Sequence, residues 1–131
     1  MLPRHFRLAL GLLAAMAASP ASAYVAINLF TVQRLDADRM QVLPRGGLTS
    51  IDGWCAVGDY AITVLSLPPN TPIWRVSEPP RRAKEVLVFS FSAEGAAKSN
   101  GLNQFGNSTL YLTAAAARAF CPESIAYWTW M

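Results

Sequence analysis

One stretch of the chain decides its fold: SIDGWCAVGDYAITVLSL, residues 50–67. Apolar and small residues recur in it at spacings of three and four, which places them on one face of a helix; they are Trp54, Val57, Gly58, Ala61, Val64 and Leu65. The opposite face is mostly polar and carries Asp52, Ala56, Asp59, Thr63 and Ser66. This pattern predicts an amphipathic helix that lies on a sheet, with its second face in solvent.

The ends of this helix are marked by the residues around it. Thr49, Ser50 and Asp52 are candidate N-caps, and an acid in the first turn suits the helix dipole. Two prolines at 68–69 stop the helix, because the residue before a proline avoids the helical region. Gly58 costs roughly 1 kcal/mol in a helix interior relative to alanine. We therefore expect another backbone to approach the helix closely at Gly58.

The chain contains two cysteines, Cys55 in the predicted helix and Cys121 near the C-terminus. In an oxidising compartment, an even number of widely separated cysteines indicates a disulfide. The alternative is a reactive Cys55 thiolate close to a helix N-terminus. A partner cysteine is available and no histidine accompanies Cys55, so the disulfide is the favoured interpretation.

Residues 1–23 have the pattern of a secretory signal peptide. A short basic segment, residues 4–7, precedes an uninterrupted apolar run at 8–18, and the small residues Ala-Ser-Ala follow at 21–23. The apolar run is short for a membrane span, so an uncleaved N-terminal anchor is the weaker alternative. We expect export to a bacterial periplasm or beyond the cell, which leaves residues 24–131 as one small domain.

The predicted mature chain excludes several classes of function. Its nine basic and eight acidic side chains nearly balance, and it has no continuous basic stripe, so no nucleic-acid partner is expected. The only histidine, His5, lies in the predicted signal peptide. Cleavage of the signal peptide would leave a mature chain without histidine, which excludes the usual Ser-His-Asp and Cys-His catalysis and histidine metal sites. No glycine-rich phosphate loop, CxxC or GxSxG motif occurs, and we expect no cofactor and no metal.

The rest of the domain reads mainly as short strands. Strands are predicted, from alternating apolar residues between turn signals, at 24–35, 39–43, 73–76, 85–92 and 109–112. A loop rich in glycine and serine is expected at 93–108 and a short helix, capped by Thr113, at 114–120. This order indicates an α+β fold: a small antiparallel sheet with the main helix on one face. The disulfide would fasten the short C-terminal helix to the main one.

The segment Trp54-Cys55-Ala56-x-Gly58-Asp59-Tyr60-Ala61 resembles a motif of small exported α-proteobacterial proteins. These proteins carry a Trp-Cys pair at the start of a helix and a second cysteine near the C-terminus. The resemblance covers the signal peptide, the helix motif and the cysteine spacing. It implies a periplasmic address and a disulfide, and it implies no chemical activity.

Two segments are candidate interaction surfaces. Arg81 and Arg82 lie in the proline-containing loop SEPPRRAK, residues 77–84, which suits an acidic surface, although a solvated loop is the simpler interpretation. The C-terminal tail is aromatic and carries Tyr127, Trp128 and Trp130, residue types enriched at interfaces. Burial of the tail against the domain is the alternative, and the lack of nearby basic residues disfavours a membrane surface.

A carboxylate pair is the remaining catalytic hypothesis. Asp52 and Asp59 lie two turns apart on one helix face, a separation of about 10 Å, which is near the upper end for an inverting glycosidase. Asp36 and Asp38 are better explained by a hairpin turn than by calcium binding. The sequence therefore favours a non-enzymatic exported interaction or accessory domain with a protein partner in the envelope. The alternatives are a small secreted inhibitor of a hydrolase and, last, a carboxylate-dependent hydrolase.

Overall fold

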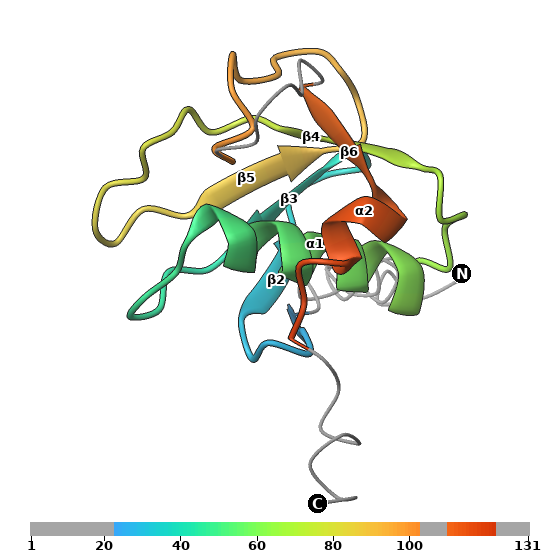
Figure 1. Cartoon of the computed structure of the whole chain (residues 1–131), viewed down its shortest axis with the longest axis horizontal. Coiled ribbons are helices and arrows are strands. Elements are labelled where there is room, and N and C mark those ends of the chain that lie inside the picture. Colours follow the sequence, from blue (N-terminus) through green and yellow to red (C-terminus); the bar gives the residue numbers. More distant parts are fainter. Residues whose placement is uncertain (1–22, 103–109, 123–131) are drawn as a thin grey trace, which may run out of the picture.

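A computed structural model of the chain describes residues 23–102 and 110–122. These residues form one antiparallel sheet with two helices on one of its faces (Figure 1). The strands lie in the order β1-β2-β3-β5-β4-β6. The elements are β1 (Ala23–Val25), β2 (Thr31–Arg34), β3 (Arg39–Val42), α1 (Ser50–Thr63), β4 (Pro72–Arg75), β5 (Leu87–Ser90), β6 (Tyr111–Thr113) and α2 (Ala114–Arg118). The predicted α+β architecture is confirmed.

Helix α1 begins with a capping box. Thr49 is the N-cap: its Oγ1 accepts a hydrogen bond from the Asp52 backbone N–H at 3.2 Å, and its own N–H donates to Asp52 Oδ2 at 3.0 Å. This reciprocal pair satisfies two amides that the first helical turn leaves without intrahelical partners. The helix ends at Thr63, before the predicted end at Leu67, and the Leu67 N–H turns back to the Ala61 carbonyl at 3.0 Å.

The inner face of the sheet packs on α1 through large side chains. Trp54 meets Phe89 of β5 edge to face, with ring centroids 4.8 Å apart, and both side chains are fully buried. Such edge-to-face pairs stabilise beyond the area that they bury. Gly53 allows the close approach, since a Cβ at this position would lie 2.5 Å from Leu87 Cδ1. Leu87 and Phe89 thus lie on the face of the sheet that meets α1.

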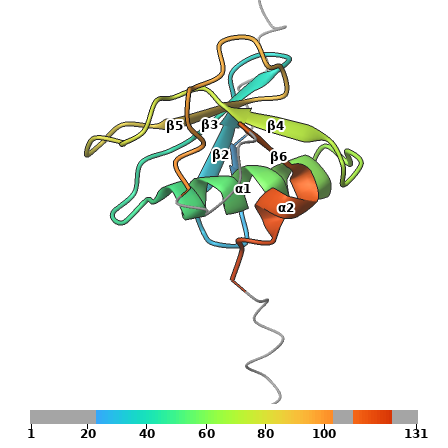
Figure 2. The same ribbon diagram turned by 45° about the horizontal axis from the view of Figure 1, so that its top comes forward.

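The expectation of a solvated second face on α1 holds for Thr63, which is exposed, but is wrong for the middle of the helix. Residues 53–61 are all buried, Asp59 among them. Helix α2 and the turn after β1 cover this side, and Figure 2 shows α2 packed directly beside α1 beneath the sheet. The amphipathic pattern of a single helix does not reveal this, because the covering residues of α2 are small alanines from a distant part of the chain.

A disulfide joins Cys55 and Cys121 across 66 positions of sequence, as predicted. It links the middle of α1 to the residue that follows the last turn of α2, with 4.7 Å between the Cα atoms. The expected backbone contact at Gly58 is also present. A Cβ there would lie 2.4 Å from the Arg118 backbone nitrogen. Helix α2 is thus held on α1 by a covalent link and by close backbone packing.

The predicted strand at 24–35 is two strands. Strand β1 pairs antiparallel with β2, with Tyr24 opposite Val32, and a tight turn separates them. In that turn the Ala26 N–H donates to the Phe30 carbonyl at 2.9 Å, and Leu29 adopts a left-handed backbone with φ of 70°. The turn contains no glycine or proline, so the apolar alternation continues through it and hides it from sequence reasoning. The predicted hairpin between the segments at 24–35 and 39–43 is confirmed in the pairing of β2 with β3.

Replacing Gly58 by alanine is expected to lower the free energy of unfolding by about 1–3 kcal/mol, because the new Cβ would overlap the α2 backbone. Urea denaturation measures the change. Gly46→Ala is the matched control, since a Cβ at Gly46 has nothing within 4 Å. A Gly58→Ala variant as stable as the unaltered protein would show that α2 does not press on α1 here.

Removing the disulfide by a Cys55→Ala/Cys121→Ala double substitution is expected to cost about 4 kcal/mol, the loop-closure value for a long loop. Denaturant midpoints in the absence of reductant measure the loss. The unaltered protein in excess reductant should then unfold close to the double variant. Equal midpoints under oxidising conditions would contradict a stabilising role for the bridge.

Candidate functional site

A basic pocket lies between two loops that connect to the neighbouring strands β3 and β5. One loop comes after β3 and the other before β5, and the pocket of about 330 Å³ between them is lined by Pro44, Arg45, Gly46, Gly47, Arg81, Ala83 and Lys84. Three of these residues are cationic, and none is acidic. Both loops project on the side of the molecule where α1 begins (Figures 1 and 2). We refer to Arg45, Arg81, Arg82 and Lys84 together as the basic loop pair.

Arg81 braces the two loops. Its Nε donates to the Leu48 carbonyl of the other loop at 3.1 Å, and its Nη1 donates to the carbonyls of Arg82 and Glu85, each at 3.1 Å. Most of the hydrogen-bond donors of the Arg81 guanidinium are therefore satisfied by carbonyl groups of the protein. The sequence does not distinguish Arg81 from Arg82, whereas the structure gives Arg81 a positioning role within the loops.

Arg82 and Lys84 are the accessible cations of the pair. Both residues are exposed, and neither cationic group forms a hydrogen bond or ion pair within residues 23–102 and 110–122. Lys84 adopts a left-handed backbone with φ of 69°, an uncommon conformation for a residue with a Cβ. Glu85 is the acid nearest in sequence, and its Oε2 accepts from the Arg82 backbone N–H at 3.1 Å.

Arg45 was missed in the sequence and is added by the sheet register. Val42 at the end of β3 pairs with Leu87 near the start of β5, which brings the loop after β3 beside the loop before β5. Arg45 Nη1 donates to the Leu29 carbonyl at 3.2 Å. The only local signal was one arginine in a proline- and glycine-rich loop. The other predicted surface, Tyr127, Trp128 and Trp130, lies outside the residues that the structure describes.

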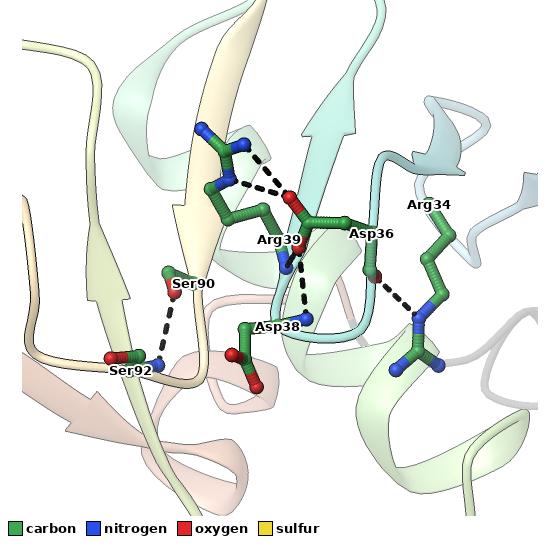
Figure 3. Close-up of polar contacts among 6 residues, drawn as sticks. All are labelled: Arg34, Asp36, Asp38, Arg39, Ser90 and Ser92. Carbon is green, nitrogen blue, oxygen red and sulfur yellow. Dashed lines mark hydrogen bonds and ion pairs between the residues drawn. The ribbon is translucent and has the colours of Figure 1, made fainter.

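A second pocket, of about 480 Å³, lies at the opposite end of the β3–β5 pair. Its lining includes Asp36, Asp38, Arg39, Ser90, Ser92 and Glu94. Asp36 is held by Arg39, whose Nε donates to Oδ2 at 2.8 Å, and by the backbone N–H groups of Arg39 and Asp38 at 2.8 and 3.0 Å (Figure 3). The backbone hydrogen bonds from Arg39 and Asp38 and the Arg39 side chain lower the pKa of the Asp36 carboxyl.

The polar groups of this second pocket serve mainly to close the β2–β3 turn and the turn that follows β5. Arg34 Nε donates to the Asp36 carbonyl at 2.9 Å, and Ser90 Oγ accepts from the Ser92 N–H at 3.0 Å. The Asp38 carboxylate points away from the Asp36–Arg39 pair (Figure 3). Across the described part of the chain, no group of three or more histidine, cysteine, aspartate or glutamate residues could hold a metal ion. The turn interpretation of Asp36 and Asp38 fits these contacts.

The two carboxylates of the hydrolase hypothesis are used by the fold. Asp52 closes the capping box of α1. Asp59 is buried, and its carboxylate accepts hydrogen bonds from the Tyr24 hydroxyl at 2.9 Å, the Ile27 N–H at 3.0 Å and the Thr63 hydroxyl at 2.9 Å. Arg118 of α2 adds an ion pair at 3.6 Å. Asp59 therefore ties β1 and α2 to α1.

No protein-family model matches the chain, and no curated protein or solved structure matches it either. Within the residues that the structure describes, no helix is both long and apolar enough to span a bilayer.

Replacing Tyr24 by phenylalanine is expected to lower the free energy of unfolding by about 1–2 kcal/mol at neutral pH, because Asp59 loses a hydrogen-bond donor. Burial, followed by the hydrogen bond to Asp59, raises the pKa of the Tyr24 hydroxyl above its ordinary value. The protonated form is therefore favoured in the folded protein, so this contribution is complete below about pH 10 and is lost as the pH rises through the raised pKa.

Urea denaturation of both proteins between neutral pH and pH above 10 measures this effect. The difference between the unaltered protein and Tyr24→Phe should narrow at high pH. The other tyrosines are present in both proteins and cancel in the comparison. A difference that stays constant above the pKa would contradict the assignment to the Tyr24–Asp59 bond.

Proposed function

We propose that this protein is an exported, non-enzymatic binding domain whose acting surface is the basic loop pair. The observation that carries the proposal is the convergence of Arg45, Arg81 and Lys84 on one pocket without an acidic lining residue. The partner that this surface fits is an acidic patch on another protein of the envelope. Complementary charge of this kind speeds encounter and selects the partner more than it adds affinity.

The construction of the loops supports a binding role. Arg81 cross-links the two loops through the Leu48 carbonyl, so the exposed cations next to it start from a braced backbone. A braced surface loses less conformational entropy when it binds than a flexible loop does. Arg82 and Lys84 have no internal acceptors among the described residues, which leaves their charges available to a partner.

Export is part of the same proposal and is supported by two features. The first 23 residues have the pattern of a signal peptide, with a basic segment, an apolar run and the small residues Ala-Ser-Ala at 21–23. The disulfide is typical of proteins that fold in an oxidising compartment such as the periplasm. Tyr24, the first residue of the predicted mature chain, is anchored to Asp59.

Inhibition of a secreted hydrolase is a second candidate, and one observation favours it. Arg82 is exposed, and hydrogen bonds from the Arg81 side chain hold the loop that carries it. An inhibitory loop needs these two properties, an accessible side chain and a rigid backbone. A trypsin-like protease, whose specificity pocket holds an aspartate, is the class that would accept such an arginine. Inhibition of trypsin that is lost in Arg82→Ala and kept in Lys98→Ala would favour this alternative.

The binding proposal is tested with the photo-crosslinking residue benzoylphenylalanine at position 83, since Ala83 is exposed and lines the pocket. The variant is expressed in the native organism and crosslinked by irradiation of the cells. The crosslinked adduct is then identified by mass spectrometry. An Arg82→Glu/Lys84→Glu background should reduce the yield of a specific adduct by roughly tenfold or more, because both accessible charges are reversed. Raising the salt concentration should also reduce it.

Lys98→Glu is the matched control, because Lys98 is exposed and lies outside the basic pocket. It should leave the adduct yield unchanged. Circular dichroism of each purified variant confirms folding before the comparison. An adduct of the same identity and yield in the doubly reversed variant would refute the basic loop pair as the acting surface.

A further inference from the structure

The guanidinium of Arg75 is a positive charge buried inside the protein. Arg75 lies in β4 with its side chain on the inner face of the sheet, and only 1% of the residue is exposed to solvent. Burial of an ionised side chain without a counter-charge costs several kcal/mol. A buried guanidinium is therefore expected to have a carboxylate, or another anion, beside it.

The acceptors that Arg75 has are neutral. Nε donates to the Ser77 carbonyl at 2.7 Å, while Nη1 donates to Ser50 Oγ at 2.6 Å and, more weakly, to the Asn100 carbonyl at 3.5 Å. Nη2 is buried and has no hydrogen-bond partner among residues 23–102 and 110–122. The protein thus supplies acceptors for the other two nitrogens, whereas the buried N–H pair of Nη2 has none in this part of the chain.

No carboxylate among residues 23–102 and 110–122 forms an ion pair with Arg75. Glu78 is the acid that acts on it electrostatically, but Glu78 is exposed and its Oε1 accepts from the Lys98 backbone N–H at 3.0 Å. Burial lowers the pKa of the Arg75 guanidinium, and Glu78 only partly opposes that effect. The ordinary pKa is so high that the group remains charged at any physiological pH.

A second positive feature meets the guanidinium. Ser50, which accepts from Nη1, is the first residue of α1, a helix of 14 residues. The N-terminus of such a helix carries partial positive charge from its free backbone amides. Asp52 is the acid in this turn, and its Oδ2 is already engaged by the N–H and the hydroxyl of Thr49. The buried guanidinium thus meets the half-buried start of α1 at Ser50, and Asp52, whose Oδ2 is turned to Thr49, forms no ion pair with it.

We infer that a small inorganic anion of the chloride type binds beside Arg75 Nη2 at the N-terminus of α1. A monatomic ion suits the site better than an oxyanion, because it needs the least room beside a fully buried side chain whose neighbouring nitrogen, Nη1, is already closed over by the backbone at Gly101. A Cβ at Gly101 would lie 2.0 Å from Arg75 Nη1 and 2.6 Å from Ser50 Oγ. Gly101 also has φ of 78°, which favours glycine there. A water molecule could accept from Nη2 but would leave the buried charge uncompensated.

Thermal unfolding of the purified protein tests this site, with chloride exchanged for gluconate at constant ionic strength. A ligand bound only by the folded state raises Tm as its concentration rises above the dissociation constant. We expect Tm to rise by about 3 °C between low and roughly 300 mM chloride. Arg75→Gln should lose this dependence, whereas Lys98→Gln, which removes one positive charge at an exposed position outside the basic loop pair, should keep it.

Crystals grown with bromide in place of chloride provide a measurement that does not depend on the stability of a variant. An anomalous scattering peak within hydrogen-bonding distance of Arg75 Nη2 is the expected result. A water molecule or an empty position there, or a Tm that is the same in chloride and gluconate for the unaltered protein, would overturn the inference.

Discussion

The contact between α1 and α2 is the constraint on which the rest of this structure depends. Gly58 lets the backbone of α2 approach α1 closely, and the disulfide from Cys55 to Cys121 keeps it there. Helix α2 is too short to be stable by itself, so it needs this support. Once α2 is in place, Arg118 lies beside Asp59, and the side of α1 that faces away from the sheet becomes part of the core.

Asp59 extends that contact to the N-terminal part of the domain. A buried carboxylate is costly unless its oxygens are hydrogen-bonded, and here three donors from different segments meet it. Tyr24 and Ile27 bring β1 and its turn, and Thr63 belongs to α1 itself. The same residue that could have been part of a catalytic pair thus organises the edge of the fold. Its role follows from burial, which the helix pattern alone did not indicate.

The arginines show how one residue type serves three purposes in a small protein. Arg81 donates hydrogen bonds to carbonyl groups of two loops and so holds the loops in position. Arg82 is exposed and keeps its charge for solvent or a partner. Arg75 is enclosed, with neutral acceptors on two of its three nitrogens. Burial and the available acceptors distinguish these roles, since all three residues are arginines in β-prone or loop sequence.

Several features of this protein were determined by its sequence alone. The periodicity of residues 50–67 predicted the main helix, Thr49 and Asp52 predicted its start, and the two cysteines predicted their bridge. These depend on local spacing, on capping chemistry and on the number of cysteines. The cost of Gly58 in a helix likewise predicted a close backbone contact. The β2–β3 hairpin followed from turn residues between alternating segments.

Only the tertiary structure decided which surfaces are exposed and which charges meet. The cover that α2 provides over Asp59, the turn hidden between β1 and β2, and the approach of Arg45 to the loop at 81–84 all join segments far apart in the chain. Such pairings depend on sheet register and on packing of small side chains, neither of which leaves a local pattern. For the same reason, the burial of Arg75 became visible only when β4 was placed between β5 and β6 in the sheet, against the start of α1.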